Sequence, residues 1–390
     1  MKTERELELY IHIPFCIRKC AYCDFLSAPS TETVRKAYVD ALCREIRLSG
    51  EEQKDALVTS VFIGGGTPSV LTARQTEQIL EALGDAFRIR SDAEISMEVN
   101  PGTTDRDRLS SYKKNGINRL SIGLQSANDN ELQVLGRIHD YAAFQRTFQE
   151  ARQAGFTNLN VDLMAAIPGQ TLRSYEESLK KVLSLQPEHI SAYSLILEEG
   201  TPFYEWYQEG KGQTDHPALP EEEEERRMYE RTHELLTAEG YHRYEISNYA
   251  KPDRECRHNI GYWKRKEYLG LGIGAASLIR ETRFTNIRNL TEYIACIRGG
   301  GQLEQIRENY ERLGKQDQIE ETMILGLRME QGVSLAEFEQ RYGVSMMELY
   351  RKVIEKYTGY GLLNCQDGYL HLTERGISVS NVILADFLFD

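Results

Sequence analysis

The chain has 390 residues, of which 41% are hydrophobic and 27% are charged, values typical of a globular protein. A formal net charge of −13 argues against a general nucleic-acid binder, because such proteins neutralise phosphates with a basic surface. No apolar run approaches the roughly 20 residues that span a bilayer, and the charged start MKTERELELY is unlike a signal peptide. Seven cysteines, an odd number, indicate a reducing compartment rather than a disulfide framework. We therefore expect a cytoplasmic protein.

The densest chemistry lies in the stretch YIHIPFCIRKCAYCDF, which starts at Tyr10. Cys16, Cys20 and Cys23 follow a short apolar run, Leu9 to Ile13, that predicts a strand. Three thiolates this close in sequence can converge on one metal centre, and a cluster with four irons would then keep one iron open. Structural zinc instead closes its shell with four ligands, and no second cysteine pair lies nearby. The spacing therefore favours an iron–sulfur cluster over zinc.

From the cysteine loop to about residue 200, strand-like runs alternate with amphipathic helical stretches. After the opening strand, the predicted strands are 60–63, 94–99, 119–123, 158–163 and 189–197. The helical stretches between them are 34–48, 74–86, 105–114, 142–154 and 172–185. Such repeats predict a parallel sheet with helices outside it, here with about six units rather than the eight of a closed barrel. The predicted fold class is thus α/β, a partial (β/α)6 barrel.

Polar residues follow these strands at the ends where chemistry sits in such folds. Three glycines, Gly64 to Gly66, and Thr67 follow the second strand, and bare N–H and C=O groups there can approach a ligand closely. Four further residues lie at or just beyond such strand ends, namely Glu98, Gln125, Arg137 and Asp162. Each taken alone is equally compatible with a solvated loop residue. Together they suit a nucleoside that carries a ribose diol and an amino-acid tail.

A second informative stretch, CRHNIGYW, begins at Cys256. An imidazole such as His258 is a good axial ligand for haem iron, and aromatic rings stack on a macrocycle. On residue types alone the alternative is favoured, in which His258 and Asn259 bridge loops while Tyr262 and Trp263 pack in a core. Cys256 also stays open as an iron ligand.

The pattern changes after residue 200, and we expect three parts: 1–210 as the barrel, 211–300 as a segment that completes it, and 301–390 as a small C-terminal domain. In the middle part, 244–250 reads as one strand and 268–277 as a close-packed strand and turn at the open side of the barrel. In the last part, helices at 319–329, 335–341 and 345–360 precede a hairpin and a final helix, 373–388. This order is winged-helix-like. The acidic balance argues for a lid or partner surface rather than DNA binding.

The C-x3-C-x2-C spacing after a strand resembles the signature of the radical S-adenosylmethionine (SAM) superfamily. Over nearly its whole length the chain is similar to the group around oxygen-independent coproporphyrinogen III oxidase, in YIHIPFC, GGGTPS, EVNP, RLSIGLQS, DLMAAIPGQT and LTERG. The oxidase branch carries a fourth cysteine two residues after the third and an N-terminal extension. Here Phe25 stands at that position and nine residues precede Tyr10, which points to the haem-chaperone branch. The His-Asn-x-x-Tyr-Trp motif of that branch is matched from His258 to Trp263.

The resemblance implies a role for each motif residue. The cluster, a [4Fe-4S] cluster, would be held by Cys16, Cys20 and Cys23. The SAM site would be lined by Tyr10, Gly65, Gly66, Thr67, Glu98, Gln125, Arg137 and Asp162. Haem would be bound by His258, Asn259, Tyr262 and Trp263.

The resemblance also implies a function. The protein would bind haem and pass it to respiratory haem proteins at the inner face of the membrane, with homodimerisation linked to the cluster. The alternative is an enzyme of porphyrin biosynthesis that decarboxylates coproporphyrinogen III propionates oxidatively. A SAM-dependent methylase of another substrate also stays open.

Overall fold

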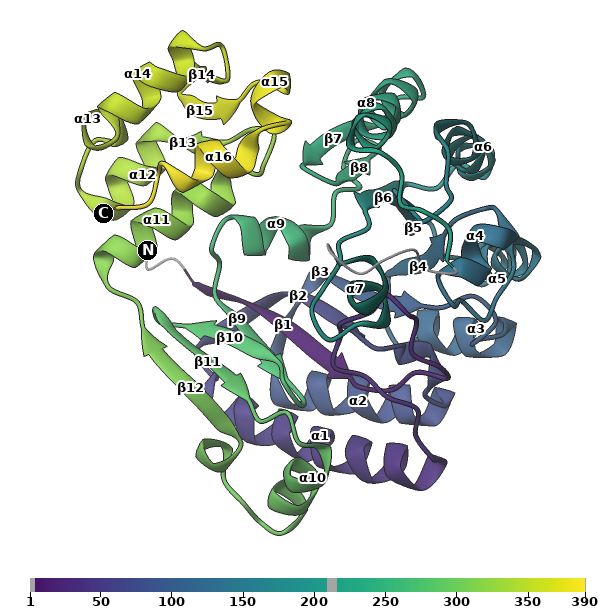
Figure 1. The fold of residues 1–390 in the computed structure, drawn as a ribbon. Helices are drawn as coiled ribbons and strands as arrows, with labels where there is room; N and C mark the ends of the chain where they lie inside the picture. The colour runs from purple at the N-terminus through teal and green to yellow at the C-terminus, as the bar shows by residue number, and fades with distance from the viewer. Residues whose placement is uncertain (1–3, 209–215, 390) are drawn as a thin grey trace.

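A computed structural model describes residues 4–208 and 216–389 of the chain. Its centre is one twelve-stranded sheet in the order β12-β11-β10-β9-β1-β2-β3-β4-β5-β6-β8-β7. β1 to β6 pair in sequence order, each parallel to the next. Figure 1 shows helices α1, α2, α3, α5 and α6 along the outside of this curved sheet. The predicted α/β fold with a partial barrel of parallel strands is therefore confirmed.

The strands of the large sheet are β1 (Arg5–Ile13), β2 (Ala56–Gly65), β3 (Arg88–Val99), β4 (Arg119–Gln125), β5 (Leu159–Ala165), β6 (His189–Ser194), β7 (His242–Glu245), β8 (Asn248–Ala250), β9 (Tyr268–Leu271), β10 (Ala276–Ile279), β11 (Thr282–Asn286) and β12 (Arg307–Arg312). The helices around it are α1 (Glu32–Glu52), α2 (Ala73–Ala86), α3 (Arg106–Lys114), α4 (Asp129–Val134), α5 (Tyr141–Gln153), α6 (Leu172–Leu183), α7 (Pro202–Tyr207), α8 (Glu222–Ala238), α9 (Arg257–Trp263) and α10 (Leu290–Arg298).

Alternation along each parallel strand decides what faces the interior of the barrel. In β1, Leu7, Leu9 and Ile11 are fully buried in the hydrophobic core that the outer helices share. Successive side chains point to opposite faces of a strand, so Glu8 and Tyr10 point the other way, into the barrel. The same rule holds in β2 to β6, and it gives the barrel a polar interior.

Further strands are added at both edges of the six parallel strands. β9 runs parallel to β1, and β10, β11 and β12 add to it as antiparallel strands. Gly270 is required there, because a Cβ would lie 2.3 Å from the carbonyl oxygen of Ala276. The expected close-packed strand and turn at 268–277 is thus confirmed.

At the other edge, the expectation of one strand over 244–250 is wrong. Two short strands, β7 and β8, pair antiparallel, and β8 pairs with β6. The break comes between them, where the carboxylate of Glu245 accepts a hydrogen bond from the N–H of Ser247 at 3.2 Å and closes a turn. Such a side-chain-capped turn interrupts a run whose composition favours a strand.

The C-terminal part packs round a core of its own, with Met323, Phe338 and Leu370 buried in it. Its elements are α11 (Lys315–Gly326), β13 (Val333–Ser334), α12 (Leu335–Tyr342), α13 (Met346–Leu349), α14 (Arg351–Gly359), β14 (Leu363–Gln366), β15 (Tyr369–Leu372), α15 (Glu374–Ile377) and α16 (Ser380–Ala385). The helices expected at 345–360 and 373–388 are each divided in two. The three-stranded sheet, in the order β13-β15-β14, completes a winged-helix-like unit.

Ion pairs join this unit to the large sheet. Arg265, two residues after α9, donates to Glu321 on α11 at 2.7 Å, and Arg243 of β7 donates to Glu374 at 2.5 Å. Within the described ranges, no helix combines the length and apolarity that a membrane crossing requires. The division expected at residue 210 lies outside the described residues, and the one expected at residue 300 stays a prediction.

Candidate functional site

The cysteine loop leaves the end of β1 and is closed at its base by the backbone. The N–H of Cys16 donates to the carbonyl of Ala28 at 3.2 Å, and that of Ala28 donates to Pro14 at 3.0 Å. Cys16, Cys20 and Cys23 are free thiols. All three line a cavity of about 590 Å³ at the mouth of the barrel. The loop thus presents its sulfurs to one shared space.

The nearest imidazole, that of His12, has both ring nitrogens in hydrogen bonds within the protein. The ring accepts a hydrogen bond from the Tyr10 hydroxyl at Nδ1 (3.0 Å), and its Nε2 lies 2.8 Å from the carbonyl of Leu26, to which it donates. His12 therefore supports the far side of the cysteine loop. In the described ranges, no three His, Cys, Asp or Glu side chains are already grouped as a site for a single ion. The donor set that fits a metal centre is the three thiols alone, which suits a cluster with one open iron.

The glycines after β2 pack against this loop. A Cβ on Gly66 would lie 2.6 Å from the carbonyl oxygen of Phe15, and Gly65 has a φ of +112° that favours glycine. The N–H groups of Gly65, Gly66 and Thr67 donate to Glu98, Ile13 and Phe15 respectively. The expectation that these amides stay bare for a ligand is therefore wrong, because the protein itself uses them.

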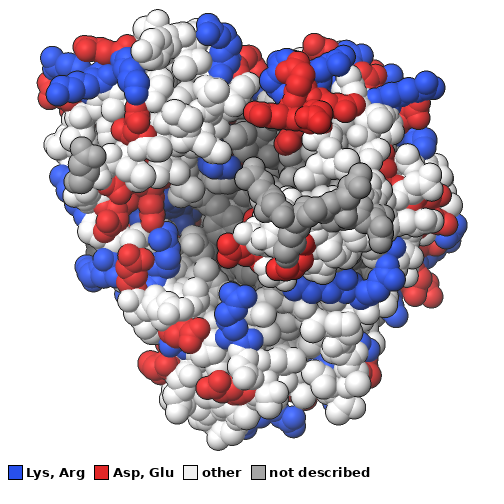
Figure 2. Space-filling model, in the orientation of Figure 1, with Lys and Arg blue, Asp and Glu red and all other residues white. Residues whose placement is uncertain are grey.

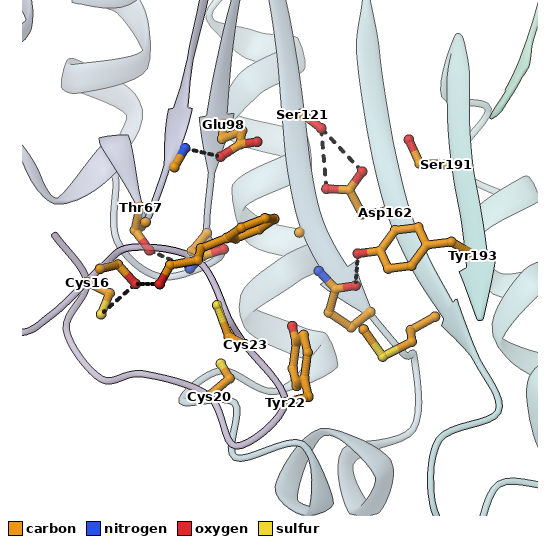
Figure 3. Close-up of a pocket in the computed structure, with 18 of the residues that line it drawn as sticks. Cys16, Cys20, Tyr22, Cys23, Thr67, Glu98, Ser121, Asp162, Ser191 and Tyr193 are labelled. Carbon is orange, nitrogen blue, oxygen red and sulfur yellow. Dashed lines mark hydrogen bonds between the residues drawn. The ribbon is translucent and has the colours of Figure 1, made fainter. Parts of the chain in front are cut away.

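The opposite wall of the cavity is polar. Figure 3 shows the sulfurs on one side, with Tyr22 beside Cys20 and Cys23, and Glu98, Ser121, Asp162 and Tyr193 on the other. Asp162 accepts from Asn160 at 2.6 Å and from Ser121 at 3.3 Å. The strand-end residues predicted from the sequence, together with Tyr10, Gly65, Gly66 and Thr67, all line this one cavity.

Burial raises the pKa of both carboxyl groups, Glu98 and Asp162. Desolvation, with the neighbouring charge of Asp162 as a smaller cause, raises the pKa of Glu98 to about 8. Desolvation also raises the pKa of Asp162, and hydrogen bonds from Asn160 and the charge of Arg119 oppose this rise. A group that binds here and donates hydrogen bonds or brings positive charge would favour the ionised forms.

Arg137 is buried beside the cysteine loop. Its Nη2 donates to the carbonyl of Gly123 at 2.6 Å and to Asn100 Oδ1 at 2.9 Å, and its Nη1 lies 3.7 Å from Cys20 Sγ. The guanidinium therefore ties the end of β4 to Cys20 of the cysteine loop. The structure places Arg137 at the wall of the cavity, where the sequence predicts it.

Sequence reasoning missed several residues that line the same cavity. Tyr193 of β6 donates from its hydroxyl to Gln125 Oε1 at 2.9 Å. Asn100, Ser121, Met164 and Ser191 also line the space. A signal was present for Tyr193 and Ser191, since they occupy the inward-facing positions of the sixth strand.

The second motif forms α9, a seven-residue helix across the interior of the barrel (Figure 1). The helix divides the motif between two spaces. Asn259 lines the large cavity with the cysteines, whereas Tyr262 and Trp263 line a second cavity of about 420 Å³. Tyr10 lines both cavities. The structure thus brings Tyr262 and Trp263 together and places Asn259 apart from them.

The second cavity lies between α9, the strands β9 and β10, and α11 of the C-terminal unit. Its walls are mainly apolar and aromatic, with Tyr268, Leu278 and Leu325 beside the motif residues. At one end lie Arg265 and Arg283, both paired with Glu321 at 2.7 Å. Nη1 of Arg265 is buried and has no hydrogen-bond partner within the described part of the chain. On this face Figure 2 shows a hollow between the C-terminal unit and the barrel.

His258 lines neither cavity. It is 1% exposed, stacks on Phe62 with ring centroids 5.3 Å apart, and has both ring nitrogens in hydrogen bonds, to Ser60 and Tyr262. Cys256 is buried as well, with its thiol 3.3 Å from Glu94, and desolvation raises its pKa above the ordinary range. A protonated, hydrogen-bonded thiol is a poor iron ligand. His258 is therefore the better candidate for an iron ligand, because its Nε2 contacts Tyr262, which lines the second cavity.

Comparison with known proteins first defines the class. Residues 10–182 match the radical SAM superfamily, and residues 313–379 match the HemN C-terminal domain. Coproporphyrinogen III oxidase (HemN) from Escherichia coli, described as a radical SAM enzyme, has a similar solved structure. The TM-score is 0.83 at 27% identity, over 98% of this chain and 90% of that chain. The chain is thus a radical SAM protein with a HemN-type C-terminal domain.

Relatives that are similar over nearly their full length identify the family within this superfamily. The heme chaperone HemW of Bacillus subtilis is 37% identical over 97% of this chain and 98% of its own. The heme chaperone HemW of Escherichia coli is 34% identical over 98% of both chains. The chain therefore belongs to the HemW family.

Proposed function

We propose that the protein is a haem chaperone that binds a [4Fe-4S] cluster, SAM and haem and delivers haem to respiratory haem proteins. The observation that carries the proposal is the pair of cavities divided by α9. One is polar and contains the cysteine loop, and the other is apolar and contains Tyr262 and Trp263.

The polar cavity fits the cluster and SAM. Cys16, Cys20 and Cys23 would hold the cluster, and its open iron would bind the amino and carboxylate groups of SAM. Glu98, Gln125 and Asp162, with Tyr10, Gly65, Gly66, Thr67 and Arg137, would surround the rest of SAM. The protein's own part is to bury these groups, so that hydrogen bonds to the ligand form in a poorly solvated space.

The apolar cavity fits haem. Tyr262, Trp263 and Tyr268 offer aromatic faces to a macrocycle. Nη1 of Arg265, which has no partner among the described residues, offers a donor to a propionate. His258 would then ligate the iron from behind Tyr262. Asn259 would act from the other side of α9, as part of the wall between the two cavities. Delivery would take place in the cytoplasm at the inner face of the membrane, and a homodimer linked to the cluster is part of the same proposal.

The likeness to HemN supports one alternative, oxidative decarboxylation of coproporphyrinogen III. Against it stands Phe25, which is 58% exposed at the cavity where the oxidase branch has a fourth cysteine. The discriminating experiment reconstitutes the cluster without oxygen, titrates the protein with haem and assays coproporphyrinogen III conversion in parallel. Stoichiometric haem binding without decarboxylation is the expected result. Turnover to protoporphyrinogen would replace the chaperone function with the oxidase function.

A further inference from the structure

His258 lies in a short chain of buried polar groups. Its Nδ1 is 2.9 Å from Ser60 Oγ and 3.8 Å from Glu8 Oε2, and its Nε2 is 3.0 Å from the Tyr262 hydroxyl. Glu8 is 2% exposed and His258 is 1% exposed. These groups come from β1, β2 and α9, so the fold assembles them from distant parts of the sequence.

The contacts of His258 are compatible with one tautomer in particular. If the Tyr262 hydroxyl donates to Nε2, the ring proton sits on Nδ1, where it faces the Ser60 hydroxyl and the carboxyl group of Glu8. The Ser60 oxygen can accept from Nδ1 and keep its own proton to donate.

The helix is shaped to admit this carboxyl group. A Cβ on Gly261 would lie 2.0 Å from Glu8 Oε1 and 2.1 Å from Oε2, so any larger residue would have to displace the Glu8 carboxyl group. In the described ranges, Oε2 of Glu8 has no hydrogen-bond partner, which is costly for a buried oxygen. An oxygen acceptor behind the far nitrogen of an imidazole is the usual way that proteins orient a histidine toward a metal.

We propose that Glu8 and Ser60 are positioning residues that hold His258 ready to bind haem iron through Nε2, and that the Tyr262 hydroxyl covers this nitrogen until haem arrives. The proposal rests on the haem-binding function proposed above. Tyr262 lines the apolar cavity and His258 does not, so iron reaches Nε2 only after the hydroxyl moves aside. The Tyr262 ring packs edge-on against Tyr268, with centroids 4.7 Å apart, which holds the cover in place.

The tautomer can be tested without haem. Nitrogen-15 NMR of the haem-free protein, compared with His258→Ala to identify the ring signals, should show a protonated Nδ1 and an unprotonated Nε2. A proton on Nε2 would overturn the proposal whether or not the protein binds haem.

The positioning role of Glu8 predicts a loss of haem affinity that a packing role would not produce. Glu8→Gln keeps the shape of the side chain but replaces one carboxyl oxygen by an amide nitrogen, and haem affinity should fall about 10-fold with a shifted Soret band, as for outer partners of metal-bound histidines. Glu6→Gln, an exposed position on the same strand, is the matched control and should behave as wild type. Unchanged affinity and spectrum in Glu8→Gln would contradict the proposal.

The covering role of Tyr262 predicts a gain in rate. Tyr262→Phe keeps the ring and removes the hydroxyl, so haem should associate several-fold faster in stopped-flow mixing while the spectrum of a histidine-ligated haem is kept. An unchanged rate, or a loss of binding equal to that of His258→Ala, would show that the hydroxyl does not cover Nε2. If the wild-type protein binds no haem, the proposed function fails, and the NMR measurement still decides how Glu8 and His258 are arranged.

Discussion

The two cavities on either side of α9 are built in opposite ways. The walls of the polar cavity come largely from the ends of consecutive parallel strands, so each lining residue follows from a simple alternation rule. The apolar cavity is formed where α9, β9, β10 and α11 meet, and these elements do not repeat. A repeated βα unit therefore makes a site that can be read from the chain, whereas a cavity between irregular parts needs the structure.

This contrast explains what the sequence could predict. The parallel sheet and the strand-end residues Glu98, Gln125 and Asp162 follow from local periodicity. The contact between Glu8 and Gly261 does not, because it joins residues about 250 positions apart and depends on how α9 crosses the barrel. The aromatic and imidazole side chains of the second motif are evident from the sequence. Only the structure divides them, with Asn259 on one side of α9 and Tyr262 on the other.

The largest expected effect tests whether the cluster and haem bind in different cavities. Cys20→Ala removes one of the three proposed cluster ligands, so iron content and the cluster's visible absorbance should fall to background, while haem binding stays within twofold of wild type, on the order of 0.4 kcal/mol. Iron analysis and a haem titration measure both. Cys365→Ala, an exposed thiol on β14, is the matched control and should change neither. If Cys20→Ala loses haem binding and the cluster to the same extent, the two ligands share one site.

A second prediction concerns the dehydrated carboxyl group of Glu98. Its pKa in the folded protein is raised to about 8, so the unfolded chain releases this proton first and stability falls as the pH rises toward 8. From pH 5 to pH 8 this group alone should cost about 3 kcal/mol of unfolding free energy. Urea unfolding of Glu98→Gln should lack this decline. If the unfolding free energies of variant and wild type change with pH in the same way, the pKa of Glu98 is not raised.

A third prediction tests how tightly α9 packs on β1. Gly261→Ala drives a methyl group into the Glu8 carboxyl group and should lower the unfolding free energy by about 3 kcal/mol. Gly84→Ala, inside α2 with nothing within 4 Å of the added atom, should instead raise it by up to about 1 kcal/mol. Denaturant midpoints of the two variants give the comparison. Similar values for both would mean that α9 shifts freely.

The smallest expected effect is at Phe25. Phe25→Cys supplies the thiol that the oxidase branch has, at an exposed position, so stability should change by less than about 0.5 kcal/mol. Cluster content should stay that of the three-cysteine site, and coproporphyrinogen III should stay unconverted. Gain of conversion would reduce the difference between the two branches to this single residue.

Simultaneous binding of SAM and haem tests the central claim most directly. The cluster-loaded protein is saturated with SAM and then titrated with haem, and both ligands are counted after rapid gel filtration without oxygen. Two separate cavities predict one SAM and one haem on the same chain, with a haem affinity that SAM changes by less than about twofold. Displacement of SAM by haem in proportion to the haem bound would contradict the account, because both ligands would then occupy the cavity of the cysteine loop.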